Sequence, residues 1–124
     1  MEAQTAEAVR AKTRLVGNLD ATKLDMWWST LASGPVFDIG TVILTPDAWE
    51  QVPGIDLLLA LGLHQCGEWG KVCDVIWQRN LNALNSKASI LSLWTPKEAP
   101  DFWVVTDRSQ SGPTTEVSIW HPHA

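Results

Sequence analysis

Residues 55–70 read IDLLLALGLHQCGEWG, an apolar segment that runs into two closely spaced glycines. Its first part is apolar on nearly all sides, which predicts a helix packed into the middle of a small domain. Gly67 is well placed as the left-handed residue that ends this helix. Gly70 then permits a close turn, with Trp69 anchoring it in the core. The segment HQCGEWG (64–70) therefore predicts a corner between two helices.

We expect residues 1–35 to form a helical appendage and residues 36–124 to form the main domain. The appendage begins with a weak, alanine-rich helix over residues 2–16. Asp20 can cap a second helix, whose large apolar residues recur at i, i+3, i+4 and i+7 and so make one stripe. These residues are Leu24, Trp27, Trp28 and Leu31.

The main domain is predicted to be α+β: one strand, a helical insert of two to three helices, then a three-stranded antiparallel meander. Residues 36–45 are a β-branched run typical of a strand. Thr45 as N-cap and Pro46 at the first helical position begin a short helix, and a last helix covers about 71–84. The segments between the final strands are loops rich in Pro or Gly, and consecutive strands joined by loops of this length usually pair antiparallel. These strands are expected at 89–94, 102–107 and 114–120. The helices are expected on one face.

The composition restricts the class of protein. A hydrophobic content of 45% and a charged content of 19% are those of a globular domain. A net charge of −5 with nine Lys and Arg argues against a protein that coats DNA, but not against a nuclease with local positive charge. No apolar run approaches the roughly 20 residues of a membrane span, and the N-terminal segment lacks a signal peptide's apolar region. We therefore expect a cytoplasmic protein without a membrane partner.

Aromatic usage is unusual, with eight Trp, two Phe and no Tyr. Eight indoles cannot all be fully interior in so small a domain, and exposed Trp is enriched in binding hot spots. We therefore expect at least one Trp to contact a protein partner. The candidate binding residues are Trp27, Trp28, Trp69, Asp107 and Arg108.

His64 has two interpretations. As a catalytic residue it is a general acid or base, oriented by Glu68 or by a distant carboxylate. As a structural residue it lies at a helix C-terminus, where its positive form is favoured and its ring can bond the last carbonyls.

The segment VVTDRSQSGPTT (104–115) also has two interpretations. Arg108 can present a fork of donors to a phosphate or carboxylate. Alternatively, the segment is a polar hairpin loop in which Asp107 and Ser109 satisfy backbone amides. If His64, Arg108 and either Thr114 or Thr115 met at one mouth, they would suit metal-free RNA cleavage, with His for proton transfer and Arg for the pentavalent phosphorane.

No metal or cofactor is expected. His64, Cys66 and Cys73 are three possible ligands, but their spacing matches no standard zinc site. We expect both cysteines to be free, buried thiols. The chain has no GxGxxG after a strand, and no Walker, GxSxG, HExxH or EF-hand motif.

The chain resembles a set of small proteins from plasmids and other mobile elements. The resemblance lies in the order of these segments: TPDA (45–48), LLLALGLHQCGEWG, Asn80, SILSLW, WVVTD, R and TT. Some of these proteins carry the label of a type I restriction–modification subunit. Their pattern is approximately T-P-G-A, R-H-x-x-G-D-W-G, I-x-S-x-Y, W-V-I-T-E-A-D-R-S-x-T-T and P-E-Y. The resemblance covers about residues 37–120, and it singles out His64, Gly67, Trp69, Gly70, Thr106, Asp107, Arg108, Ser109, Thr114 and Thr115.

This sequence departs from the pattern at several positions. Leu63 replaces the basic residue before the histidine, Glu68 stands for Asp, and residues 110–113 lengthen the turn before the two threonines. The resemblance implies an association with mobile DNA and no defined activity. Our main hypothesis is a small cytoplasmic accessory protein of a mobile element that binds another protein, such as a host defence component. One alternative is a metal-free, toxin-like ribonuclease that uses His64, Arg108 and Thr114 or Thr115. A second alternative is a purely structural or regulatory domain with no pocket.

Overall fold

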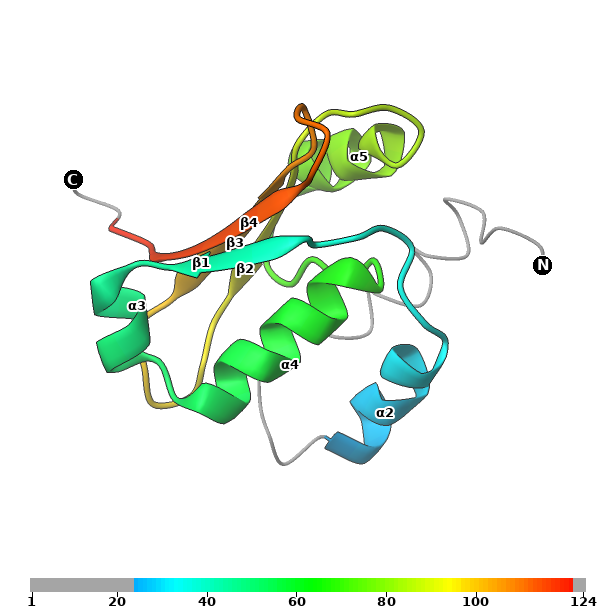
Figure 1. Cartoon of the computed structure of the whole chain (residues 1–124). Helices are drawn as coiled ribbons and strands as arrows, with labels where there is room; N and C mark the ends of the chain where they lie inside the picture. Colours follow the sequence, from blue (N-terminus) through cyan, green and yellow to red (C-terminus); the bar gives the residue numbers. More distant parts are fainter. Residues whose placement is uncertain (1–23, 122–124) are drawn as a thin grey trace.

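The computed structural model describes residues 24–121, which form four helices and one four-stranded sheet (Figure 1). The α+β class predicted from the sequence is confirmed. The helix expected over residues 2–16 lies outside the described residues, as does Asp20. The helices are α2 (Leu24–Ala32), α3 (Pro46–Gln51), α4 (Gly54–Gln65) and α5 (Asp74–Ala83). The strands are β1 (Thr41–Leu44), β2 (Ile90–Trp94), β3 (Phe102–Asp107) and β4 (Thr114–Ile119).

The sheet is mixed and has the strand order β1-β4-β3-β2. Strands β2, β3 and β4 pair antiparallel, as expected, but β1 adds to β4 in parallel. The three-stranded meander is therefore only part of a larger sheet. A parallel neighbour requires a long crossover connection, which the helices and the first two strands of the meander supply between β1 and β4.

The main core lies between the sheet and α4. Alternate residues of β3 and β4, such as Val104 and Val117, point to this inner face and are fully buried. They share one apolar cluster with Leu57, Ala60 and Leu63 of α4. The alternation of the strands and the apolar surface of the helix thus meet in one layer.

Helix α2 covers the other side of α4 (Figure 1). Trp27 is fully buried in the same cluster as the α4 leucines. A methyl group added at Gly62 would lie 2.9 Å from Leu31 Cδ2, so the two helices approach closely there. The described part of the predicted appendage thus shares the core of the main domain.

Helix α5 lies along the edge of β2 that is not paired with β3. The expectation that all the helices occupy one face of the sheet is therefore wrong. The Asn80 amide donates to the carbonyl of Leu91 (2.7 Å) and accepts its N–H (3.1 Å). Next along the strand, Leu93 donates to Trp69 O (3.3 Å) and accepts from Lys71 N–H (2.8 Å). The outward backbone groups of Leu91 and Leu93 are therefore all satisfied.

The corner at HQCGEWG forms as predicted. Gly67 has φ +89°, Gly67 N–H donates to His64 O (3.2 Å), and Glu68 N–H donates to Leu63 O (2.9 Å). This pair of bonds is a Schellman motif, which satisfies the last carbonyls of α4. Trp69 is fully buried, in the cluster that also contains Trp77.

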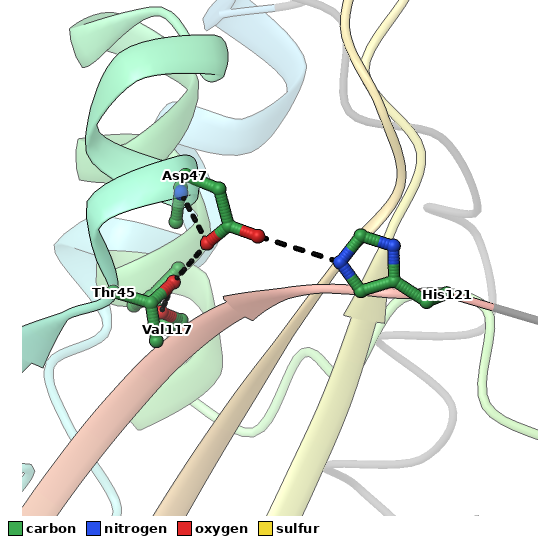
Figure 2. A network of polar contacts seen from close by, with 5 residues as sticks. Thr45, Asp47, Val117 and His121 are labelled. Atoms are coloured by element: carbon green, nitrogen blue, oxygen red, sulfur yellow. Dashed lines mark hydrogen bonds and ion pairs between the residues drawn. The ribbon is translucent and has the colours of Figure 1, made fainter. Parts of the chain in front are cut away.

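Helix α3 is held against the end of β4 by polar contacts (Figure 2). Thr45 is the N-cap residue but makes no cap bond with its side chain. Its hydroxyl instead donates to Asp47 Oδ1 (2.7 Å) and lies 3.1 Å from Val117 O. The Thr45 hydroxyl lowers the pKa of Asp47, whose other oxygen lies 3.4 Å from His121 Nε2.

We predict that Gly70→Ala destabilises the protein by about 2 kcal/mol or more, because two penalties combine. Gly70 has φ +64°, and an added Cβ would lie 2.0 Å from Leu93 O, on the strand that the corner pairs with. Urea unfolding followed by Trp fluorescence measures the change.

The control for this prediction is Gly54→Ala at the start of α4. No atom lies within 4 Å of a Cβ placed at Gly54, so this change is neutral or stabilises by a few tenths of a kcal/mol, on the order expected for Gly→Ala in a helix. Equal unfolding midpoints for the two variants would contradict the proposed role of Gly70.

Candidate functional site

His64 lies on α4 and is fully buried against the inner face of the sheet. Its Nδ1 is 2.7 Å from Ser92 Oγ on β2, and its Nε2 is 2.9 Å from Thr106 Oγ1 on β3. Both ring nitrogens are therefore bonded to hydroxyl groups of the sheet.

These bonds belong to a longer chain of side-chain contacts. The Trp94 indole N–H donates to Ser92 Oγ (2.7 Å). At the other end, Thr106 Oγ1 lies 2.7 Å from Thr115 Oγ1, and Thr115 donates to Ile39 O (2.7 Å). Five hydrogen bonds thus link α4, three strands and the segment before β1.

The two ends of the chain fix its direction. An indole N–H can only donate and a carbonyl can only accept, and each hydroxyl has one hydrogen. Since Thr115 donates to Ile39 O, Thr106 must donate to Thr115 and His64 must donate from Nε2 to Thr106. Nδ1 then accepts from the Ser92 hydroxyl. His64 is therefore the neutral Nε2–H tautomer, and each hydrogen of the chain has an acceptor.

Burial lowers the pKa of His64 from 6.5 to about 3. The hydrogen-bond chain points the same way, because an imidazolium would carry a second donor where Ser92 already donates. This corrects the expectation of a favoured positive form that bonds the last carbonyls of the helix. Neither ring nitrogen is bonded to Glu68, so the expected orienting carboxylate is replaced by Ser92 and Thr106.

The proposed catalytic residues do not share an accessible mouth. His64 and Thr115 are both buried and belong to one chain, whereas Thr114 is exposed. Phe37 contacts His64 edge-to-face, with 5.2 Å between the ring centroids, and Arg108 Cζ lies 5.7 Å from the centroid of the same Phe37 ring. In this arrangement His64 cannot exchange a proton with a substrate, so the ribonuclease alternative lacks its general acid or base.

Arg108 ties the loop after β3 to the end of α5. Its Nη1 donates to Ala83 O (2.7 Å), a carbonyl in the last turn of that helix, where positive charge is favoured. The expected fork of donors is thus partly used within the fold. Arg108 also lines an open depression on the surface, together with Lys87 and Asp38.

Asp107 fits the hairpin interpretation of its loop. Its Oδ1 accepts the backbone N–H of Ser109 (2.9 Å) and the Ser109 hydroxyl (2.7 Å). These bonds, the hydroxyl first, lower the pKa of Asp107. Its side chain is exposed, but this oxygen is occupied within the loop.

The eight tryptophans divide between the core and the surface. Four are fully buried: Trp27, Trp69, Trp77 and Trp94. Trp28, Trp49 and Trp120 are exposed, and Trp103 is half-buried. Indoles therefore do lie at the surface, as the sequence indicates. Two of the proposed binding residues are corrected: Trp27 and Trp69 pack inside and cannot contact a partner in this fold.

Sequence reasoning missed Ser92 and Leu58. Ser92 lies between Ile90 and Trp94 at the alternate positions of a strand, and a polar residue among inward apolar positions signals a buried polar partner. Leu58 lies in an apolar run and could not be distinguished there from its buried neighbours.

Within residues 24–121, no three His, Cys, Asp or Glu side chains are grouped closely enough to hold a metal ion. Neither Cys66 nor Cys73 is joined in a disulfide. Cys66 is buried as expected, but Cys73 is exposed, which corrects that prediction. No helix in the described part of the chain is both long and apolar enough to span a membrane.

Comparison with family models, with curated proteins and with solved structures finds no match for this chain.

We predict that His64 makes the stability depend on pH between about 6.5 and 3. In this range the unfolded chain binds a proton that native His64 does not, so the free energy of unfolding falls as the pH falls. The difference in bound protons between the unfolded and native states approaches one. The free energy of unfolding then changes by about 1.4 kcal/mol per pH unit.

Urea unfolding at pH 7, 6 and 5 measures this slope for the wild type and for His64→Gln, which has no titrating ring. The two slopes should differ by close to one proton at the lower pH values. ¹⁵N NMR of the wild type should show the Nε2–H tautomer unchanged down to pH 5. Equal slopes, or an imidazolium signal at pH 5, would exclude the neutral buried state.

The threonine pair gives a second test of the hydrogen-bond chain. Thr115→Val keeps the shape of the side chain but leaves Ile39 O without its donor and Thr106 without its acceptor, so it should destabilise by about 1–3 kcal/mol. The neighbouring Thr114→Val, at an exposed position of the same strand, should change stability by less than about 0.5 kcal/mol. Similar unfolding free energies for the two variants would contradict the chain.

Proposed function

We propose that this protein is a small cytoplasmic accessory protein of a mobile genetic element that acts by binding another protein. The contact surface in this proposal is the helical surface, defined as the exposed side chains Trp28 of α2 and Ile55 and Leu58 of α4.

The observation that carries the proposal is the exposure of large apolar side chains on a helix pair that also builds the core. Trp28 is 69% exposed although its neighbour Trp27 is fully buried, and Leu58 is 70% exposed between buried Leu57 and Leu59. Single exposed apolar residues are common. An indole and a leucine on adjacent helices, however, are typical of protein contact surfaces.

The geometry of the helix pair supports one continuous surface. Leu31, one turn after Trp28, lies against Gly62, one turn after Leu58. Helices α2 and α4 run in the same direction in Figure 1. Trp28 and Leu58 therefore lie at the same level of the pair, with Ile55 one turn before Leu58 on the same side of α4.

Binding fits the geometry better than catalysis does. Of the predicted catalytic residues, His64 is enclosed, and Arg108 is partly used by the end of α5. The mobile-element setting and a host defence component as partner rest on the resemblance of the HQCGEWG and TDRS segments. The chain's net charge of −5 would suit a partner with a basic surface.

We predict that Trp28→Ser and Leu58→Ser each weaken capture of a host-lysate partner by at least about tenfold, the loss expected when a contact worth about 1.4 kcal/mol or more is removed. The wild-type protein and its variants are immobilised, and quantitative mass spectrometry compares the lysate proteins that each one captures. Trp27 is left unchanged because its loss would open the core.

Two control variants have nearly the same exposure outside the helical surface. Val75 on α5 is 70% exposed and matches Leu58, and Trp49 on α3 matches Trp28. Val75→Ser and Trp49→Ser should retain the partner. If all four variants capture the same proteins equally, the helical surface is not the contact. If Trp49→Ser loses the partner as Trp28→Ser does, the wild type binds nonspecifically through any exposed indole.

A further inference from the structure

The two edge strands of the sheet differ in whether their outward backbone groups are hydrogen-bonded. On β2, the outward backbone groups of Leu91 and Leu93 are all bonded by Asn80, Trp69 and Lys71. On β1, within residues 24–121, only β4 pairs with the strand, and its other edge is open (Figure 1). An unpaired strand edge is a template for another strand.

The backbone groups that face the open edge can be identified. Thr41 N–H donates to Pro113 O and Thr45 N–H donates to Val117 O, both at 3.1 Å. Because successive residues of a strand direct their backbone groups to opposite edges, Val42 and Leu44 direct theirs away from β4. Two N–H groups and two carbonyls are thus available on the open edge.

We propose that this open edge pairs antiparallel with β1 of a second copy of the chain. In the register centred on Ile43, Val42 of one copy faces Leu44 of the other, and four backbone hydrogen bonds form between them. The two Ile43 side chains lie directly opposite each other at the twofold axis. The result is one continuous eight-stranded sheet with the axis perpendicular to it.

The segment is self-complementary. TVILT (41–45) carries no charge although the whole chain has a net charge of −5, so two copies can align without placing like charges opposite each other. Ile43 is 48% exposed and Val42 is also exposed, so pairing would bury apolar side chains on both faces of the sheet.

The flanking residues limit the pairing to these positions. Gly40 N–H is already bonded to Asp38 Oδ1 (2.9 Å), and Pro46 has no N–H to donate. The same ends are present in both copies, so the ladder stops symmetrically. Helix α4 packs against β2 and β3, whereas β1 lies at the opposite edge of the sheet from β2.

This inference does not rest on the proposed function, because β1 contains no residue of the helical surface. Ile43 and Ile55 are both 48% exposed, one on β1 and one on α4, and so they provide a matched pair. Ile43→Lys places two ammonium groups opposite each other in the proposed dimer, whereas Ile55→Lys adds the same charge elsewhere.

The experiment is sedimentation velocity of the full-length protein over a series of concentrations. The wild type and Ile55→Lys should reach twice the 13.7 kDa chain mass, and Ile43→Lys should dimerise at least about tenfold more weakly. An equal mixture of Ile43→Lys and Ile43→Glu should recover the dimer, because only this register places residue 43 opposite residue 43. A wild type that stays monomeric, or a dimer that Ile43→Lys does not weaken, would overturn the proposal.

Amide hydrogen exchange gives a readout that does not depend on a variant folding. Protection of the Val42 and Leu44 amides should rise with protein concentration, while the Thr41 and Thr45 amides, bonded to β4, are protected throughout. If Val42 and Leu44 stay unprotected in the dimer, β1 is not the interface. If they become protected only when host lysate is added, the edge accepts a partner strand and not a second copy.

Discussion

The buried hydrogen-bond chain through His64 is the constraint on which the arrangement of the other elements depends. A fully buried imidazole that faces hydroxyl groups and no carboxylate is most stable when it is neutral and bonded at both nitrogens. Ser92 and Thr106 meet this requirement from two adjacent strands, and Thr115 continues the chain to a third. A slip of one residue in any of these strands would turn its hydroxyl to the other face, so the chain specifies the register of the meander as well as the position of α4.

Residues that the sequence pattern marks as candidate functional residues build this scaffold. His64, Thr106 and Thr115 form the chain, Gly67 and Gly70 form the corner, and Arg108 bonds the end of α5. A histidine, an arginine and hydroxyl groups in one pattern indicate proton transfer and phosphate binding when only the sequence is considered. In the fold, the same polar groups are largely engaged by one another and by backbone carbonyls, so they contribute to the specificity of the fold and not to an open reaction centre.

The sequence predicts those parts of the fold that depend on local chemistry. Pro46 starts α3, Gly67 ends α4, and alternation of polar and apolar residues identifies β4, because each signal acts within a few residues. The parallel pairing of β1 with β4 could not be predicted, since it depends on how the intervening helices return the chain. The neighbours Trp27 and Trp28 belong to one apolar stripe, and which of them is buried depends on the side from which α4 approaches. His64 is similar: its partners lie on other strands, and only the register brings them together.

The two surfaces singled out by the geometry can act together. Helices α2 and α4 lie on the inner side of the sheet (Figure 1), and a twofold axis perpendicular to the sheet keeps the inner sides of both copies facing the same way. Two helical surfaces would then lie on the same side of the sheet, with a separation fixed by the continuous sheet and not by a flexible linker. A partner with two equivalent sites at that separation would be bound much more tightly than by one copy, because the second contact is intramolecular.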